Sequence, residues 1–221
     1  QCTGTEPRKS FRRSRASALA CAVHRTRGYI SLKTNWIKSG SSSFIYYDEI
    51  ESTLDIALDK KYQSNSLGKI VITDNQTAGK GTYNKSWFNE PYKDLTFSII
   101  LGNQHNFDQS LVDESCKAVL HTLKKFQIIG YQKKPNDIYI NGEKIAGILL
   151  SNLGSINTKP YQALSIGMNI NSNLELDKID SSLKVKSTSL LRQTGDEYNR
   201  EDILCKIIES IDKAIQKLVY L

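Results

Sequence analysis

Residues 133–150 read KKPNDIYINGEKIAGILL, and this stretch decides the fold class. Two apolar runs, residues 137–140 and 144–150, flank the dipeptide Asn141-Gly142. Both residues of the dipeptide accept a positive φ, which makes it the strongest short-range signal for a two-residue hairpin turn. The sequence therefore predicts a pair of antiparallel strands here.

Further strands are predicted on both sides of this hairpin. Short apolar runs that are rich in β-branched residues and bounded by polar segments are typical of buried strands. Such runs occupy residues 45–47, 69–73, 95–101 and 163–170. The hairpin is therefore expected to belong to a larger sheet.

Helices are predicted from capping residues and apolar spacing. Ser52, followed three residues later by Asp55, matches a capping box that opens a helix reaching residue 60. Apolar residues at helical spacing predict an amphipathic helix over residues 109–126, and Asn199 caps a last amphipathic helix. Strands outnumber helices without regular alternation, so the predicted fold class is α+β, with a mixed, largely antiparallel sheet flanked by helices.

Length and composition predict one soluble globular domain. The 221 residues, 39% of them hydrophobic, can bury one core. No apolar run approaches the roughly 18 residues that span a bilayer, so no membrane partner is predicted. The cysteines show no C-x-x-C spacing, which argues against a zinc site or a disulfide framework and favours a cytoplasmic location.

The basic excess is concentrated at the N-terminus. The formal net charge is +7, and six of the eight arginines lie in residues 1–27, where Glu6 is the only acid. Residues 1–28 are predicted to be a disordered or non-native leader, with an organelle transit peptide as the alternative. The leader is too short for a helix-turn-helix domain, so no specific nucleic-acid partner is predicted. Residues 29–221 form the predicted domain.

A glycine-containing loop, QTAGKGTYNKSW at residues 76–87, follows a predicted strand. Gly79 and Gly81 allow the backbone to approach a ligand closely and to turn N–H groups toward an anion. Lys80 and Lys85 add positive charge. The pattern is not a P-loop, and such loops are also ordinary surface turns, so both interpretations stay open.

The hairpin of residues 133–150 carries a second candidate site. Pro135-Asn136-Asp137 opens it, and Lys144 and Gly147 lie on its return strand. A lysine on a rigid strand is held where a developing phosphate charge can be met at fixed geometry. The alternative is a hairpin with one exposed lysine.

Five segments of the chain resemble the motifs of biotin protein ligases. Residues 135–149 (PNDIYINGEKIAGIL) resemble K-W-P-N-D-(I/V/L)-(x)n-K-(I/V/L)-(A/C)-G-I-L, and residues 76–87 resemble Q-x-x-G-R-G-(R/Q)-x-(G/N)-x-x-W. Residues 51–53 (EST) resemble the S-T that opens the first helix of the family. Residues 165–171 (SIGMNIN) resemble its G-I-G-(I/L)-N-V-N strand, and residues 187–190 (STSL) its A-T-S-L. All five occur in family order.

This resemblance implies a class II aminoacyl-tRNA-synthetase-like biotin/lipoate ligase fold, with residues 29–221 as the catalytic domain. It also implies a two-step reaction. Biotin and Mg·ATP would give biotinyl-5′-adenylate and pyrophosphate, and a lysine of a biotin carboxyl carrier protein domain would then attack the mixed anhydride. The implied cofactors are ATP and Mg²⁺, and the implied assembly is a monomer or a homodimer. A lipoate-protein ligase and a non-catalytic biotin-binding module are the alternatives.

The resemblance also implies site residues. The catalytic residues would be Lys144, Asp137 and Lys80. Biotin would be bound by Ser52, Thr53, Gln76, Gly79, Lys80, Gly81, Thr82, Lys144 and Gly147. ATP would be bound by Gly79, Lys80, Gly81, Thr82, Trp87, Asn136, Lys144 and Asn169. For a Mg²⁺ ion carried by the ATP phosphates, Asp137 is the candidate ligand.

Four features depart from the family pattern. Lys80 replaces an arginine and loses its planar, bidentate fork. Thr82 replaces a second arginine of many members, and Lys134 replaces the tryptophan of K-W-P-N-D. The sequence ends at Leu221, where many relatives continue into a small SH3-like barrel, so this barrel is expected to be absent. These departures motivate the non-catalytic alternative, whereas the lysine and aspartate of the hairpin argue for a working enzyme.

Overall fold

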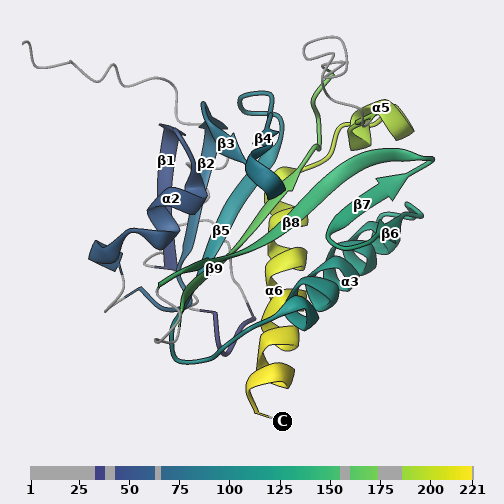
Figure 1. Ribbon diagram of the computed structural model, residues 1–221. Helices are drawn as coiled ribbons and strands as arrows, with labels where there is room; N and C mark the ends of the chain where they lie inside the picture. The colour runs from purple at the N-terminus through teal and green to yellow at the C-terminus, as the bar shows by residue number, and fades with distance from the viewer. Residues whose placement is uncertain (1–32, 38–42, 63–65, 155–159, 174–185, 221) are drawn as a thin grey trace, which may run out of the picture.

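The computed structural model describes residues 33–37, 43–62, 66–154, 160–173 and 186–220 (Figure 1). The predicted leader, residues 1–28, lies outside these residues. In the described part, strands and helices are arranged around one mixed sheet, as Figure 1 shows.

Among the described residues, seven strands form the main sheet. In chain order they are β1 (Phe44–Ile50), β2 (Ile70–Gln76), β5 (Leu95–Gly102), β6 (Tyr131–Lys133), β7 (Asp137–Ile140), β8 (Glu143–Leu153) and β9 (Tyr161–Met168). Their order in space is β1-β2-β5-β9-β8-β7-β6. β1 runs parallel to β2, and the other neighbouring strands are antiparallel. The predicted mixed, largely antiparallel sheet is confirmed.

The predicted hairpin is present as β7 and β8, joined at Asn141-Gly142. The φ angle is 49° at Asn141 and 83° at Gly142, the positive values that this two-residue turn requires. The pairing of the two strands sets Asp137 opposite Gly147. The turn sets the pairing as far as Tyr139 and Lys144, and an irregularity between Tyr139 and Ile138 then shifts the register by one residue, which places Asp137 opposite Gly147.

Helices lie on both faces of the sheet. α3 (Gln109–Lys125) and α6 (Arg200–Val219) pack against each other and bury the main core (Figure 1). The short helix α2 (Thr53–Leu58) packs with a smaller core cluster. Successive residues of a strand point to opposite faces, so Ile72 of β2 joins the main core and Val71 joins the smaller one. None of the described helices is long and apolar enough to cross a membrane.

Several short elements escaped the sequence analysis. The loop at residues 76–87 folds into a small hairpin, called here the β3–β4 hairpin. Its parts are β3 (Gly79–Lys80), the 3-10 helix η3 (Thr82–Asn84) and β4 (Ser86–Trp87). A second 3-10 helix, η2 (Lys60–Tyr62), follows α2, which ends two residues before its predicted end. α5 (Leu190–Thr194) precedes α6, whose predicted cap is confirmed because Asn199 accepts a hydrogen bond from the N–H of Asp202 (2.9 Å).

The predicted capping box at the start of α2 is wrong. Ser52 stands at the N-cap position, but its side chain makes no capping hydrogen bond. The Gln76 amide oxygen, from the end of β2, accepts the N–H of Thr53 instead (2.8 Å). The Asp55 carboxylate binds Lys80 of the β3–β4 hairpin and so does not turn back to the helix start. Tertiary partners have replaced the local cap.

Candidate functional site

A cleft opens on the sheet face that carries α2 and the β3–β4 hairpin. Its cavity measures about 40 Å³ and is partly open to solvent. Most of the predicted site residues line it: Ser52, Thr53, Gln76, Lys80, Gly81, Thr82, Trp87, Asn136, Lys144 and Gly147. The other three, Gly79, Asp137 and Asn169, lie outside the lining. Segments far apart in the sequence thus converge on one cleft.

A chain of polar side chains forms part of the cleft wall. The Gln76 amide oxygen accepts hydrogen bonds from both the N–H and the hydroxyl of Thr53 (2.8 and 3.0 Å). The Ser98 hydroxyl donates to the Thr53 hydroxyl (2.9 Å) and lies 2.7 Å from the Ser165 hydroxyl. Strands β2, β5 and β9 and helix α2 each contribute one member, so the sheet order itself assembles this chain.

Ser52 adds a hydroxyl with spare bonding capacity. Ser52 is 1% exposed, and its Oγ has no hydrogen-bond partner among the described residues. A buried hydroxyl without a partner costs free energy, so the cleft holds a polar group that a ligand could satisfy.

Lys144 lies at the other side of the cleft with its charge paired. Its Nζ is 2.6 Å from Asp137 Oδ1, and each side chain is 24% exposed. Nζ also lies over the Trp87 ring, 5.5 Å from the ring centroid. The Lys144 N–H donates to the Lys186 carbonyl, and its carbonyl accepts from the Thr188 N–H (both 2.9 Å). Backbone and side chain are therefore both held in place.

Trp87 covers two glycines of the sheet. A Cβ added to Gly167 would lie 2.3 Å from Trp87 Cε2, and one added to Gly147 would lie 3.2 Å from Trp87 Cζ3. The indole can rest on β8 and β9 only because both positions lack a side chain. Its Nε1 is buried and has no partner among the described residues.

The β3–β4 hairpin brings a second lysine to the cleft. Lys80 Nζ is 2.5 Å from Asp55 Oδ1, which ties the hairpin to α2. Its two glycines serve different ends. A Cβ at Gly79 would lie 2.4 Å from the Trp87 carbonyl oxygen, so glycine is needed there. The Gly81 N–H donates to the Lys85 carbonyl (2.7 Å), so this amide already has a partner and is not free for an anion.

Two asparagines are fixed by backbone groups. The Asn136 side-chain amide donates to the Ile148 carbonyl (2.7 Å), and the Asn136 carbonyl accepts the Ile148 N–H (2.9 Å). The Asn169 amide donates to the Thr188 carbonyl (2.9 Å), while its Oδ1 is buried without a partner among the described residues. Asn169 therefore braces the strand segment that also holds Lys144.

Residues 46–171, more than half of the chain, match the model of the Biotin/lipoate A/B protein ligase family. The chain belongs to this family. The matched region contains the whole lining of the cleft.

Relatives of this ligase family show the extent of the similarity. The bifunctional ligase/repressor BirA of Bacillus spizizenii is 29% identical over 172 residues, which cover 76% of this chain and 52% of that protein. BirA of Bacillus subtilis is 28% identical over 174 residues, with the same shares covered. The chain thus spans about half the length of these relatives. A solved structure of the biotin protein ligase from Aquifex aeolicus, in complex with biotin and ATP, is similar with a TM-score of 0.65 and 25% identity, covering 80% of this chain and 71% of that chain.

Three residues in or beside this cleft escaped the sequence analysis. Ser98 and Ser165 complete the polar chain, and Gly167 provides the seat of Trp87. A serine within an otherwise apolar buried strand was the available signal for Ser98, because a buried hydroxyl needs a partner. For Gly167 the signal was a glycine inside a strand, which marks a close approach of another group.

The predicted magnesium ligand is engaged elsewhere. Among the described residues, no group of three His, Cys, Asp or Glu side chains is placed to hold a metal ion. Asp137 is paired with Lys144. A Mg²⁺ ion that arrives with ATP is usually held by phosphate oxygens and only one or two protein carboxylates, so Asp137 as its ligand stays a prediction.

Proposed function

We propose that this chain is a biotin protein ligase, which activates biotin with ATP and transfers it to a lysine of a biotin carboxyl carrier protein domain. Membership of the family and the similarity to proteins named as biotin ligases support this reading. One observation supports the proposal most: hydrogen-bonding side chains and a lysine held in place lie at the same cleft. The wall suits a urea group, and the lysine suits a carboxylate and a phosphate.

The polar chain favours biotin over lipoate. The ureido ring of biotin has N–H and C=O groups that need partners in a closed site, whereas the dithiolane ring of lipoate has neither. Ser165 and the unpartnered Ser52 hydroxyl can supply these partners, and we assign Thr53 and Gln76 to hold them in place. A site built for hydrogen bonds discriminates strongly against an analogue that lacks the matching groups.

Lys144 is the residue on which the first step depends most. A biotin carboxylate oxygen attacks the α-phosphorus of ATP, the bond to the β-phosphate oxygen breaks, and pyrophosphate leaves. Negative charge grows on the α-phosphate oxygens during the attack, and a preorganised cation stabilises it. We assign this role to Lys144, with Asp137 holding its amine in position and Lys80 as a second cation once it leaves Asp55.

The nucleotide contacts are assigned to the hairpin and its neighbours. Trp87 provides a flat surface beside Lys144, and Gly79, Gly81 and Thr82 shape the hairpin over the cleft. Asn136 stands at the cleft edge, and Asn169, which lies outside the lining, supports the segment that holds Lys144. In the second step the amine of the carrier lysine attacks the acyl carbon, and AMP leaves.

Transfer to a carrier domain tests the proposal directly. The purified chain is incubated with ATP, Mg²⁺, a biotin carboxyl carrier domain and either biotin or lipoate, and the carrier is weighed by intact mass spectrometry. We expect ATP-dependent biotinylation. Lipoylation without biotinylation would contradict the proposal. Biotin binding without biotin-dependent pyrophosphate release would identify a non-catalytic binding module instead.

A further inference from the structure

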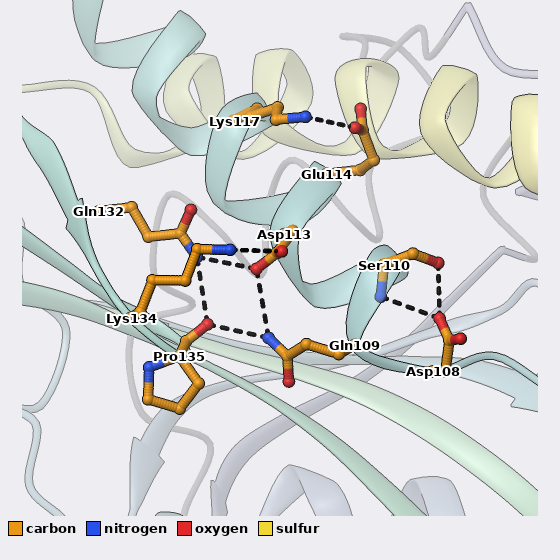
Figure 2. Close-up of polar contacts among 9 residues, drawn as sticks. All are labelled: Asp108, Gln109, Ser110, Asp113, Glu114, Lys117, Gln132, Lys134 and Pro135. Atoms are coloured by element: carbon orange, nitrogen blue, oxygen red, sulfur yellow. Dashed lines mark hydrogen bonds and ion pairs between the residues drawn. The ribbon is translucent and has the colours of Figure 1, made fainter.

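Helix α3 begins beside the turn that contains Lys134 and Pro135, and polar side chains join the two (Figure 2). The Asp113 network is defined here as Asp113 with Gln109, Gln132, Lys134 and the Pro135 carbonyl. The Gln109 side-chain amide donates to Asp113 Oδ1 (3.2 Å) and to the Pro135 carbonyl (2.9 Å). The Gln132 amide donates to the same two oxygens (3.0 and 3.1 Å).

These contacts make Asp113 an anchor for two neutral donors. Each glutamine amide has two N–H bonds, and each spends them on one carboxylate oxygen and one backbone carbonyl. The carboxylate therefore fixes the orientation in which both amides meet the Pro135 carbonyl. Both lone pairs of that carbonyl are engaged, so its direction is fixed in turn.

The second oxygen of Asp113 has a different partner. Asp113 Oδ2 is 2.7 Å from Lys134 Nζ, and the Lys134 side chain is 71% exposed. An ion pair this exposed stabilises little. The hydrogen bond from Lys134 has the largest effect, and with the bond from Gln132 it lowers the pKa of Asp113 to about 2. The Asp113 carboxylate is therefore ionised at neutral pH.

The Pro135 carbonyl immediately precedes the residues of the cleft. Asn136 is tied to Ile148 of β8 by two hydrogen bonds (2.7 and 2.9 Å), and Asp137 is paired with Lys144. The turn is thus held from α3 on one side and from β8 on the other. Loosening the α3 side would let Asp137 shift and carry Lys144 with it.

We propose that Asp113 is a positioning residue for the adenylation site, which acts through the two glutamine amides on the turn that holds Asp137 and Lys144. This inference rests on the proposed function. It assigns the effect to the amide contacts and not to the ion pair with Lys134.

Matched variants separate these contacts. Asp113→Ala removes the anchor, Asp113→Asn keeps one oxygen that can accept both amides, and Lys134→Ala removes only the ion pair. Glu114→Ala is the control: Glu114 neighbours Asp113 on α3, its side chain is also 25% exposed, and it pairs with Lys117 at 2.6 Å (Figure 2). Gln132→Leu removes one amide and serves if Asp113→Ala does not fold.

The first measurement is hydrogen exchange at the Ile148 amide, followed by NMR, because this N–H donates to Asn136. We expect about tenfold faster exchange in Asp113→Ala and less than about twofold in Glu114→Ala. The second is steady-state, biotin-dependent pyrophosphate release. We expect kcat to fall about tenfold in Asp113→Ala with KM for biotin within about twofold, because a small displacement of the lysine affects the transition state most.

The conservative variants complete the test. Asp113→Asn and Lys134→Ala are expected to keep kcat within about threefold of the unmodified chain, because the amide contacts survive. Equal behaviour of Asp113→Ala and Glu114→Ala in both measurements overturns the proposal, and so does a loss in Lys134→Ala as large as in Asp113→Ala. If the unmodified chain releases no pyrophosphate, the proposed function fails, while the exchange at Ile148 still decides whether Asp113 fixes the turn.

Discussion

At the scale of single residues, Lys144 shows how the fold prepares a charge for use. Its amine lies between the Asp137 carboxylate and the face of Trp87. The amine is thus held in one position at the cleft before any substrate binds.

We expect Lys144→Ala to slow adenylate formation by about 10²- to 10³-fold while biotin affinity changes by less than about threefold, because the lysine acts mainly on charge that develops during the reaction. Single-turnover pyrophosphate release and calorimetric biotin binding measure the two effects. Lys213→Ala, which removes an exposed lysine of α6 outside the cleft lining, is the control. Equal losses in rate and affinity would make Lys144 a binding residue only.

Gly167→Ala is expected to expel Trp87 from its seat, since the new methyl would lie 2.3 Å from the indole. We expect a loss of about 1–3 kcal/mol in unfolding free energy and a shift in tryptophan emission, read in a Trp36→Phe background. Gly147→Ala, with 3.2 Å available, should have a smaller effect. In a Trp87→Ala background the cost of Gly167→Ala should vanish; if it persists, the glycine serves another purpose.

At the scale of elements, the segment before β1 is tied to the last helix. The backbone N–H groups of Asn35, Trp36 and Ile37 all donate to the Asp212 carboxylate of α6 (2.9, 2.8 and 2.6 Å). Asp212 is 1% exposed. Two segments distant in the sequence are thereby joined.

Asp212→Ala is expected to lower the unfolding free energy by about 2–4 kcal/mol, because it leaves three backbone donors of residues 35–37 without their acceptor. Urea denaturation followed by circular dichroism measures this. Glu209→Ala is the control, since Glu209 accepts the N–H of the exposed Lys33 (3.1 Å). A cost for Asp212→Ala no larger than that of the control would show that the segment is held by other contacts.

The elements also show what a sequence can disclose. The Asn141-Gly142 turn and the Asn199 cap could be predicted because their requirements are local: two positive φ angles and one side chain beside its own helix. The capping box at Ser52 failed because Gln76 and Lys80 compete for its groups from outside the helix. β3 and β4, with two residues each, are too short to show a period, and the Ser98 contacts exist only once the strands are ordered.

At the scale of the whole molecule, a buried charged cluster joins α6 to the sheet. Arg200 Nη2 is 2.9 Å from Asp74 Oδ1, with side chains 7% and 0% exposed, and Arg200 Nη1 donates to the Asp94 carbonyl (3.0 Å). The Asp94 carboxylate accepts the N–H groups of Ile170 (2.8 Å) and Glu90 (2.9 Å). Burial outweighs these hydrogen bonds and raises the pKa of Asp94 to about 6.

This pKa predicts a pH dependence of stability. Native Asp94 holds its proton up to about pH 6, whereas the unfolded chain releases it near the ordinary value of 3.8, so stability falls as pH rises through this interval. The fall should amount to roughly 2–3 kcal/mol. Urea denaturation from pH 4 to pH 6.5 should therefore show a steeper decline for the unmodified chain than for Asp94→Ala. Equal slopes would contradict the prediction.

The hydroxyl chain of the cleft has a direction, and that direction decides what the cleft can receive. The Thr53 N–H fixes the oxygen end of the Gln76 amide, so the Thr53 hydroxyl must give its proton to Gln76 and accept one from Ser98. The Ser98 hydrogen is used in its bond to Thr53, so the Ser165 hydroxyl must be the donor in the bond between Ser165 and Ser98. Ser165 therefore offers the cleft only lone pairs. Its oxygen can accept a hydrogen bond from a donor such as a ureido N–H, but its own hydrogen is not available to a ligand acceptor.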